Sequence, residues 1–439
     1  MRVFEPKILT AFKGYKAKNF VSDIVAGIIV AIIALPLSIA LAIASGATPE
    51  VGLYTAIIAG FFIALLGGSK VNISGPTAAF ATIVAGIIAT DGMEGLVIAT
   101  IMAGIILVLM GICRVGSLIK FIPKTITVGF TGGIAVTLVV GQLKDFMGLT
   151  YPSGATAIET MDKLKLVFQN ISTINPWALI VGGIGVIILI LWPKISKKIP
   201  GSLIAVLIGA LIALIPFVKV NTIGSLYTIS SALPTFSIPE LNVQKIIAML
   251  PSAVTIALLA GIESLLSCVV SDGMVGDKHN SNTELIAQGV GNVMVGFFGG
   301  IPATGAIART AANVRNGGRS PLSGIVHAIV LLLVLVVLMP YAAMIPMPII
   351  AAILFIVAYN MSEWRAFVKI IKTKVWSDIL VLVLTFALTV IFDLVKAIAV
   401  GMVVHYVIVL IRYLMNKKKI KNQSQKNCEE QDDKEGQNA

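Results

Sequence analysis

Glu263 is a carboxylic acid in the middle of an apolar stretch, with about ten apolar or small residues on either side of it. Burying a carboxylate costs several kcal/mol unless the group is paired or protonated, so its presence indicates a function. Ser267 follows four residues later, which places both side chains on one helix face. Carboxylate and hydroxyl oxygens suit Na⁺, and a carboxylate can also take up and release a proton. The pattern predicts a coupling-ion site at Glu263 and Ser267. The alternative is a structural carboxylate that is protonated or neutralised by Arg309.

Two proline motifs lie in opposite halves of the chain, SGPTA around Pro76 and GIPAT around Pro302. Proline removes a backbone donor and glycine relaxes the backbone, so a helix is expected to start at each proline or just after it. The preceding residues, Lys70–Ser74 and Phe297–Ile301, are expected to be extended. Two helix N-termini that face each other within a membrane would form an anion site without any lysine. The alternative is a pair of proline-kinked helices packed against their neighbours.

The residues at these helix starts are the candidate anion ligands. Thr77, Ala78, Ala303 and Thr304 would offer N–H groups and hydroxyls to an oxyanion, although such residues also serve as simple helix caps. Backbone carbonyls of the second break would complete a Na⁺ shell. Arg309 is expected about two turns into the second half-helix, where it would add positive potential. Alternatively, it extends to the cytoplasmic surface with other arginines.

The composition requires a membrane to position these residues. Hydrophobic residues make up 57% of the 439 residues and charged residues only 12%, which excludes an ordinary soluble protein. The apolar runs are long, and the first is too long for a secretory signal core. About fourteen membrane segments are predicted, at 22–45, 51–68, 75–90, 94–113, 118–142, 176–192, 201–218, 251–271, 284–298, 302–315, 321–339, 346–360, 376–392 and 396–414.

The distribution of charge predicts the orientation of the chain. The net charge of +12 comes largely from Lys and Arg in short loops between apolar runs, so nucleic acid is not an expected partner. The positive-inside rule places both termini in the cytoplasm, with a cytoplasmic segment at 1–20 and a multi-pass domain at 21–415 in the inner (plasma) membrane. The stretch 362–374 is expected to be an amphipathic surface helix. The polar tail at 416–439 is expected to be disordered.

The two halves share landmarks at a nearly constant spacing. Pro302 follows Pro76 by 226 residues, and Pro348 follows Pro123 by 225. Each half would then hold about seven segments, and an odd number makes the halves run in opposite directions. The predicted fold is therefore all-α, a seven-plus-seven inverted repeat with two half-helices preceded by short extended segments. No P-loop, metal quartet or nucleophile elbow is recognisable, so neither an enzyme nor a bound cofactor is expected.

Several sequence motifs resemble those of the SulP (sulfate permease, solute carrier 26) anion transporters. They are the run from Ala34 to Phe80 with LPLSIALAIASG and NISGPTAAF, then ESLLS, NSNTELIAQGVGN and GGIPATGAIARTAANVRNGG, which begin at Glu263, Asn280 and Gly299. The chain is particularly similar to the bacterial branch that includes bicarbonate transporters. The resemblance implies an elevator-like cycle, with core segments at 21–113 and 251–339 and gate segments at 114–218 and 340–415. It also implies a homodimer as a candidate assembly.

The resemblance also implies specific site residues. The anion would lie between the third and tenth segments, against Gly75, Pro76, Thr77, Ala78, Ala303, Thr304, Gly305, Ala306 and Arg309. In Na⁺-coupled bicarbonate members the eighth segment has an acidic residue and a hydroxyl residue four positions later, which correspond to Glu263 and Ser267. Ala303 and Thr304 would contribute to the same ion site. Members usually continue into a cytoplasmic STAS domain, whereas only a polar tail follows the last segment of this sequence.

The sequence thus predicts a secondary transporter that carries sulfate or bicarbonate together with Na⁺ or H⁺. An uncoupled anion channel or an anion exchanger is the main alternative. A nucleobase carrier of the same architecture and a membrane scaffold without transport activity are further alternatives, but the scaffold leaves Glu263 unexplained.

Overall fold

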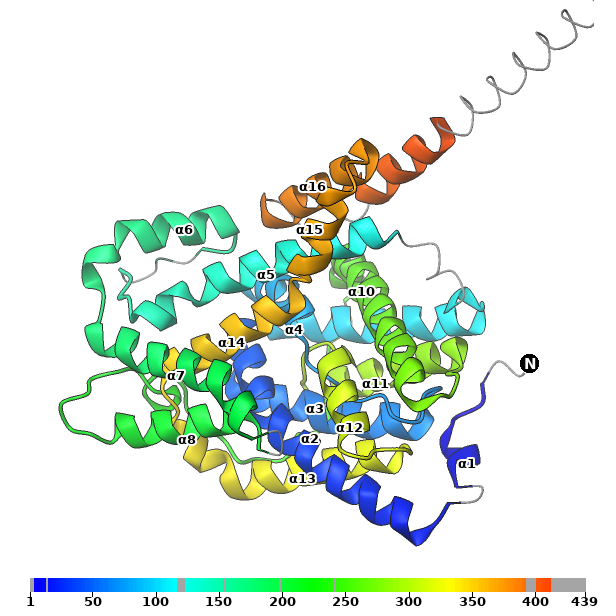
Figure 1. The fold of residues 1–439 in the computed structure, drawn as a ribbon, viewed down its shortest axis with the longest axis horizontal. Helices are drawn as coiled ribbons and strands as arrows, with labels where there is room; N and C mark the ends of the chain where they lie inside the picture. The colour runs from blue at the N-terminus through cyan, green and yellow to red at the C-terminus, as the bar shows by residue number, and fades with distance from the viewer. Residues whose placement is uncertain are drawn as a thin grey trace, which may run out of the picture. The chain divides into compact units, whose positions relative to one another are not determined.

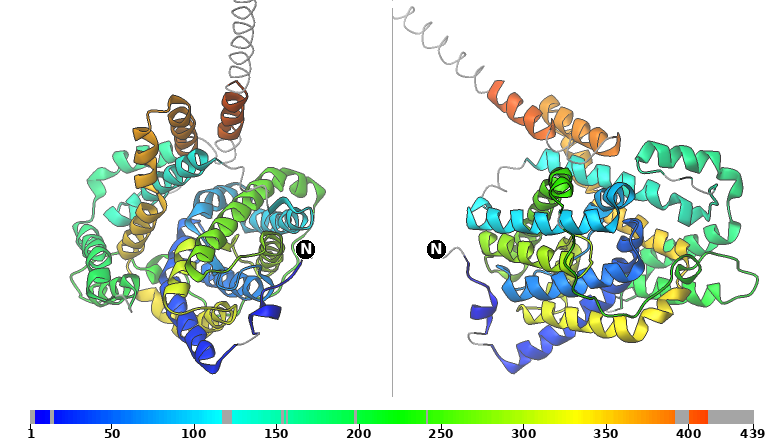
Figure 2. Two further views of the ribbon diagram at one scale, coloured as in Figure 1. Left: turned by 45° about the vertical axis from the view of Figure 1, so that its right-hand side comes forward. Right: turned by 180° about the vertical axis from the view of Figure 1, so that it is seen from behind.

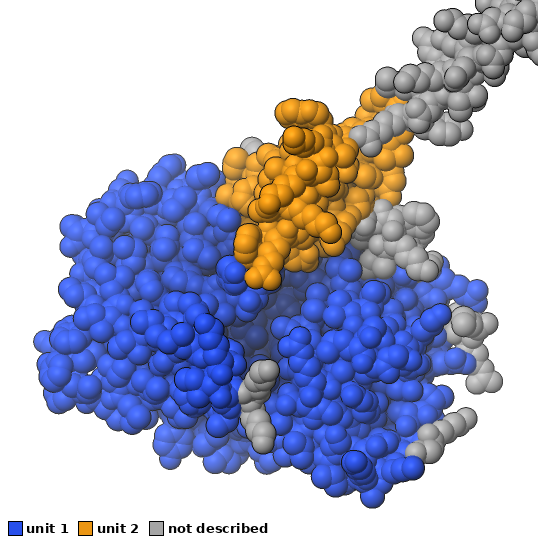
Figure 3. Space-filling model, in the orientation of Figure 1, with its two compact units in different colours: residues 1–121, 134–362 blue, residues 122–133, 363–439 orange. Residues whose placement is uncertain are grey.

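The structure is a computed structural model that describes residues 4–12, 15–116, 123–152, 155, 157–196, 199–240, 242–391 and 400–411. Its contacts divide the chain into two compact units, 1–121 with 134–362 and 122–133 with 363–439 (Figure 3). Every residue predicted to bind the anion or the coupling ion lies in the first unit. The core and gate boundaries implied by the family resemblance remain predictions.

The first unit is built almost entirely of helices (Figure 1). Those before its midpoint are α1 (Ile8–Ala11), α2 (Ala17–Ala44), α3 (Pro49–Leu66), α4 (Ala78–Ile112), α6 (Thr160–Gln169), η2 (Ile171–Thr173), α7 (Pro176–Ile195), α8 (Gly201–Ala213) and α9 (Ile223–Leu226). The others are α10 (Val243–Val275), α11 (Ser281–Phe297), α12 (Ile307–Arg315), α13 (Leu322–Leu338), η3 (Met339–Met344) and α14 (Met347–Met361). Helix α5 (Lys124–Met147) begins in the second unit and continues into the first.

Local sequence signals define several helix ends near the site. Asn242 caps α10 by accepting a hydrogen bond from the amide of Gln244 at 2.8 Å. Asn280 caps α11 in the same way. Helix α10 ends at Gly276, whose φ of 71° is the left-handed conformation that glycine adopts without strain. These signals fix the lengths of the two helices that frame the first unit's polar interior.

The two predicted breaks form a short antiparallel strand pair. Strand β1 (Ser74–Gly75) pairs with β2 (Thr304–Gly305), with Ser74 opposite Gly305 and Gly75 opposite Thr304. Strand β1 leads into α4 and β2 leads into α12. Because the strands run in opposite directions, the two half-helix starts are brought together from opposite halves of the sequence. Two half-helices preceded by extended segments are therefore present, as predicted.

The second half-helix begins later than the sequence analysis predicted. Helix α12 starts at Ile307 rather than at Pro302, and α11 still includes Phe297. The intervening backbone is held by side chains and by β1 rather than by helical bonds. Ala303 N–H donates to Asn292 Oδ1 at 2.8 Å, and Ala306 N–H donates to the Ile73 carbonyl at 2.8 Å. Arg309 is consequently the third residue of α12, not two turns into it.

The two prolines are not equivalent positions in the repeat. Pro76 directly follows β1, whereas Pro302 precedes β2 by two residues. The strands themselves are the better landmark, since they pair with one another. The spacing of 226 residues located the two breaks correctly but did not align them residue by residue.

Close helix contacts through glycine hold the first unit together around this pair. A Cβ atom at Gly104 of α4 would lie 2.6 Å from the Gly289 carbonyl of α11. The reverse substitution at Gly289 would place a Cβ 2.5 Å from the Gly104 carbonyl. Small residues at such crossings allow two membrane helices to approach closely. This contact fixes α11, which carries the polar residues described below, against α4.

The second unit contains the start of α5, α15 (Trp364–Lys372), α16 (Trp376–Ile391) and a helix at Val400–Ile411. Phe367 of α15 contacts Phe386 of α16, with ring centroids 5.5 Å apart. Helix α15 corresponds to the amphipathic helix predicted at 362–374, and its last turn carries Lys369 and Lys372. The predicted polar tail at 416–439 lies outside the described residues.

Among the described residues, eight helices are long and apolar enough to cross a membrane, and three shorter apolar helices accompany them. Each of the predicted segments overlaps one of the helices. The third and fourth predicted segments both fall within α4, which is kinked at Gly92, where φ is 69°. This kink separates a half-helix that starts at the break from the following membrane segment.

Candidate anion-binding site

The strand pair lies between long helices of the first unit. Helix α3 packs against β1, and α10 packs against both β2 and α12. Helices α10 (green) and α12 (yellow-green) lie side by side in Figures 1 and 2. The chain segments 71–76 and 301–306 are buried. Backbone polar groups at this depth need partners within the protein, because no water in the hydrocarbon region can satisfy them. The partners come mainly from α10 and α11.

Three polar side chains spaced four residues apart on α11 hold both breaks. Glu284, Gln288 and Asn292 are each fully buried. Gln288 donates to Ser74 Oγ at 3.0 Å on the first break. Asn292 bonds both backbone groups of Ala303 on the second break, at 2.8 and 2.9 Å. The stripe therefore ties the two half-helix starts to one helix.

Glu284 is a buried carboxylate that forms no ion pair with any described residue. Its Oε2 accepts from the amides of Gly68 and Ser69 at 2.9 and 3.2 Å. Its Oε1 accepts from Asn72 and Gln288 at 2.7 and 3.0 Å. Four donors replace the water that the carboxylate loses on burial. Glu284 thus fixes the loop that leads into β1.

Replacing Glu284 by Ala should destabilise the protein more than any exposed acidic substitution. It would leave two buried backbone N–H groups without an acceptor, at about 1–3 kcal/mol each. We expect a clearly lower apparent Tm in detergent, measured by the thermal unfolding of the purified protein. Glu240→Ala is the matched control, because Glu240 is exposed. Equal melting of the two variants would contradict this role of Glu284.

Asn72 connects this network to α10 and α12. Its Oδ1 accepts from the Ser267 hydroxyl at 2.7 Å and from the Thr310 hydroxyl at 2.9 Å. Among the described residues, no hydrogen bond joins Ser267 to Glu263, although both lie on α10. The structure therefore places Ser267 behind the strand pair, where its hydroxyl positions Asn72.

Ser264 and Thr304 are the hydroxyl pair nearest to the second break. Their oxygens lie 2.7 Å apart, and Thr304 also donates to the Ala260 carbonyl at 3.0 Å. The amide of Gly305 donates to Ser264 Oγ at 3.0 Å. Thr304 therefore does not cap α12, which has no side-chain cap. Its hydroxyl holds β2 against α10.

Glu263 faces the start of the first half-helix. Its Oε2 accepts a hydrogen bond from the Thr77 hydroxyl at 3.1 Å. Glu263 and Thr77 are both half-buried, so this pair borders a region open to solvent or ligand. Thr77 precedes α4 without capping it. Among the described residues Glu263 forms no ion pair, so the structure does not show it neutralised by Arg309.

Arg309 is buried beside the first break, with 2% of its surface exposed. One guanidinium nitrogen, Nη2, donates to the Pro76 carbonyl. The other two, Nε and Nη1, have no hydrogen-bond partner among the described residues. This rules out the alternative in which Arg309 extends to the cytoplasmic surface. A buried cation with two unused donors is a strong attractor for an anion.

Gly75 gives Arg309 its position by leaving room for the guanidinium. A Cβ atom at Gly75 would lie 2.6 Å from Arg309 Nη1 and 3.4 Å from the Ala56 Cα atom. No side chain can occupy that space without moving the arginine or the backbone of α3. The glycine is thus required by close approach.

Gly75→Ala should weaken anion binding by displacing the Arg309 guanidinium. We expect about a tenfold rise in the anion KM, which corresponds to the loss of about one hydrogen bond to a charged group. The measurement is the concentration dependence of labelled anion uptake into proteoliposomes. Gly86→Ala in α4 is the matched control, because nothing lies within 4 Å of a Cβ there. An unchanged KM for Gly75→Ala would contradict the assignment.

The structure brings most of the predicted anion ligands together. However, several of their backbone amides are already hydrogen-bonded within the protein and cannot bind an anion. The amides of Ala303, Gly305 and Ala306 are already bonded within the protein. Ala78 is the first residue of α4 and is buried. The helix starts have no side-chain caps, so the first amides of α4 and α12 are the backbone donors that can face an anion.

Two residues of this region were not predicted from the sequence. Ile307 and Ala308 form the first turn of α12 and are exposed. Neither has a polar side chain, so no residue-type signal could identify them. The α11 stripe was detectable, because polar residues at 284, 288 and 292 recur at helical spacing in an apolar segment.

Comparison with known proteins gives a consistent result. The model of the sulfate permease family matches residues 20–385. YvdB of Bacillus subtilis (strain 168), named for sulfate transport, is 46% identical over 414 residues, which cover 94% of this chain and 77% of YvdB. The bicarbonate transporter BicA of Picosynechococcus sp. is 35% identical over 408 residues, 90% of this chain and 71% of BicA.

Two solved structures have the same fold. The transmembrane domain of a cyanobacterial bicarbonate transporter, BicA, matches with a TM-score of 0.78 and 32% identity, covering 88% of this chain and 98% of that domain. The murine Slc26a9 anion transporter in its inward-facing state has a TM-score of 0.84 at 19% identity, covering 92% and 71% of the two chains. These likenesses confirm the predicted all-α, polytopic seven-plus-seven inverted repeat.

Proposed function

Because the chain belongs to the sulfate permease family, a family of transporters and not of enzymes, we propose that it is a secondary transporter of a small inorganic anion. Sulfate and bicarbonate are the proposed substrates, since they are the anions for which its relatives are named. The anion would cross the plasma membrane by an elevator-like movement of the segments that carry the strand pair. Cytoplasmic termini and a homodimer are part of the same proposal.

The observation that carries this proposal is the buried, partly unbonded guanidinium of Arg309. Its Nη1 lies close to Gly75, just before the start of α4, and Arg309 itself belongs to the first turn of α12; neither helix start has a side-chain cap. An oxyanion placed there would receive charged donors and the positive ends of two helix dipoles. No lysine is required, because the site concentrates positive potential in a region of low dielectric constant.

Glu263 is the proposed coupling residue. It is half-buried, it accepts a hydrogen bond from Thr77 at the start of α4, and it lies on α10, which packs against β2. A cation or proton bound at Glu263 would offset its negative charge and so favour the anion close by. Na⁺ and H⁺ both fit this role as co-transported substrates. The proposed Na⁺ ligands are Glu263, Ser267 and the second break at Ala303 and Thr304.

Two of these proposed Na⁺ ligands, the Ser267 hydroxyl and the Ala303 carbonyl, already form hydrogen bonds within the protein. The Ser267 hydroxyl is engaged with Asn72, and the Ala303 carbonyl accepts from Asn292. Among the described residues, there is no group of three or more His, Cys, Asp or Glu side chains that would hold a metal. A Na⁺ ion would therefore depend on Glu263, on backbone carbonyls and on water.

Uptake by proteoliposomes tests the proposed function. Purified protein should accumulate labelled sulfate or bicarbonate when a Na⁺ or H⁺ gradient is imposed, and unlabelled substrate should compete. Uptake without any gradient response, with a reversal potential set by the anion alone, would favour the alternative of a channel or an exchanger. The absence of uptake for both anions under all gradients would contradict the proposal.

A further inference from the structure

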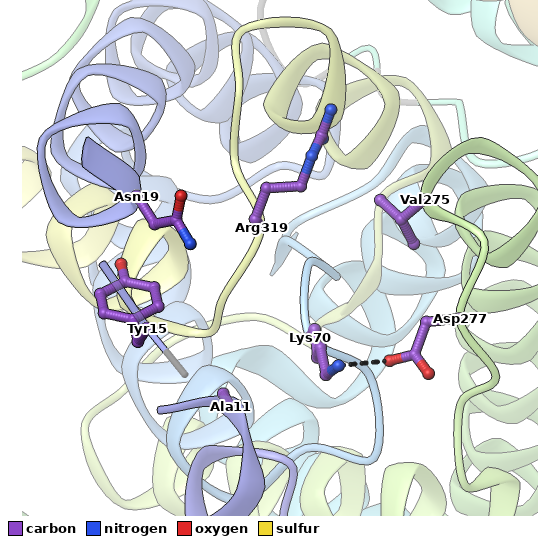
Figure 4. Close-up of a pocket in the computed structure, with 7 residues that line it drawn as sticks. All are labelled: Ala11, Tyr15, Asn19, Lys70, Val275, Asp277 and Arg319. Atoms are coloured by element: carbon purple, nitrogen blue, oxygen red, sulfur yellow. Dashed lines mark ion pairs between the residues drawn. The ribbon is translucent and has the colours of Figure 1, made fainter. Parts of the chain in front are cut away.

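A polar cavity lies in the first unit, and its lining includes no residue of the strand pair. It has a volume of about 300 Å³ and is lined by Ala11, Tyr15, Asn19, Lys70, Val275, Asp277 and Arg319. Tyr15 and Asn19 form one wall, and Lys70 and Asp277 lie on the opposite side (Figure 4). A cavity of this size accommodates a small ligand together with water. Its lining comes from four separate stretches of the chain, 11–19, 70, 275–277 and 319.

Positive charge exceeds negative charge around this cavity. Lys70 Nζ lies 2.9 Å from Asp277 Oδ2, and Lys7 Nζ lies 3.4 Å from the same oxygen. Burial alone would raise the pKa of Asp277, but the hydrogen bond from Lys70 and the charge of Lys7 lower it overall, so the carboxyl is ionised. Arg319 has no ion pair with a described carboxylate. Its Nη1 donates to the carbonyls of Val314 and Gly318 at 3.0 and 2.9 Å.

The hydrogen-bond donors that line the cavity include the side chains of Lys70 and Arg319, which are cations and cannot accept hydrogen bonds. Two acidic groups lie at the cavity: Asp277 is already shared between two lysines, and Asp23 accepts from the Arg319 amide and the Ser320 hydroxyl. The Tyr15 hydroxyl is used by Asp23, which leaves the Asn19 amide and the two cations for a ligand. This combination suits an oxyanion and disfavours a cation. A tetrahedral phosphate or sulfate group offers enough oxygens to bind Lys70 and Arg319 together.

The cavity is connected to both breaks of the transport site. Lys70 lies five residues before Gly75, and the chain between them is held to α12: Val71 accepts from Asn313 at 2.9 Å, and Ile73 N–H donates to Thr310 at 2.9 Å. Arg319 lies four residues beyond the end of α12. A ligand that bridged Lys70 and Arg319 would therefore restrain both arms of the strand pair from the far end of α12.

We propose that this cavity is a second, regulatory oxyanion site, occupied by a phosphate or sulfate group that Lys70 and Arg319 bind jointly. The group would be either a free inorganic anion or the phosphate of an anionic lipid headgroup. A bound anion would slow transport. This would provide feedback when the anion accumulates on the side of the membrane that the cavity faces. Only this effect on transport rests on the proposed function; binding at the cavity does not.

Equilibrium binding of labelled phosphate and sulfate to the purified full chain tests the site. The Arg309→Gln background removes the proposed transport site, so that any remaining binding is measured alone. We expect one saturable site there, weakened at least about tenfold by Lys70→Gln combined with Arg319→Gln, since each removes a charged donor. The exposed residues Lys278 and Arg315 provide the control, Lys278→Gln with Arg315→Gln, which should leave binding unchanged.

Further arms identify the ligand source and exclude misfolding. Lys70→Arg with Arg319→Lys keeps both charges and should retain most of the binding. Nanodiscs of phosphatidylcholine with and without phosphatidylglycerol distinguish the sources, because a lipid headgroup in the cavity would compete with phosphate. In proteoliposomes, internal phosphate should slow uptake by the wild-type protein but not by the double Gln variant. Absence of binding in the Arg309→Gln background, or binding that the double Gln variant leaves unchanged, would overturn the proposal whether or not the protein transports anions.

Discussion

Arg309→Gln is expected to reduce anion uptake to near the level of empty proteoliposomes, with a rise in KM of about 100-fold or more. The arginine is buried, and its Nε and Nη1 have no partner among the described residues. Each hydrogen bond between a charged donor and a ligand contributes about 1.5–3 kcal/mol, so two such bonds account for the expected loss. Gln is too short to reach the Pro76 carbonyl, but β1 remains paired with β2 and Ser74 remains bonded to Gln288, so the backbone of the first break should keep its position.

Arg315→Gln is the matched control, because Arg315 belongs to the same helix, α12, and is exposed at its end. Its uptake should equal that of the wild-type protein. Arg309→Lys should give an intermediate result, since it keeps the charge but loses the planar pair of donors. If Arg309→Gln transported with wild-type KM while remaining folded, Arg309 would not contact the anion.

Glu263→Gln is expected to abolish the response of uptake to the driving gradient. The amide is close in shape to the carboxylate but can neither take up a proton nor carry the charge that a cation would neutralise. Accumulation driven by a Na⁺ or H⁺ gradient should fall to the level reached without a gradient, while exchange of anion for anion continues. The measurement is labelled anion uptake in proteoliposomes, with each gradient imposed separately.

Two controls accompany this prediction. Glu94→Gln removes an exposed carboxylate that is paired with Lys245 and should leave the gradient response intact. Thr77→Val removes the hydrogen bond to Glu263 and should alter the concentration of the driving ion that gives half-maximal uptake. A Glu263→Gln protein with a full gradient response would eliminate Glu263 as the coupling residue.

The fold and the location of the site could be predicted from the sequence because both depend on large free energies. These are the burial of long apolar runs in a membrane and the loss of helical hydrogen bonds at proline. Long apolar runs define the helices, and proline with glycine marks the two breaks. The position of the second helix start was predicted wrongly because side chains hold 303–306 in an extended form. Asn292, eleven residues earlier in α11, and Ser264, 41 residues before Gly305 in α10, supply those contacts through the way the two helices pack. No local signal reveals such partners.

The binding groups were predicted less completely than their location. Arg309 and Glu263 were identified because charges within apolar segments are costly. The network of Glu284, Gln288 and Asn72 was not identified, although its members are polar and buried. Its role depends on which groups lie opposite, and these belong to the segment between α3 and α4, which the packing of α11 against both helices brings into reach. Ser267 illustrates the same point, because its spacing from Glu263 is helical but its hydroxyl bonds to Asn72.

A structure of the wild-type protein with bound anion tests the central claim most directly. Crystals grown with the transported anion, or with selenate in place of sulfate, would locate it. Density within hydrogen-bond distance of Arg309 Nη1 or Nε, facing the starts of α4 and α12, is the predicted result. An ordered anion bound elsewhere in the membrane domain, with the donors of Arg309 facing protein atoms only, would contradict the claim.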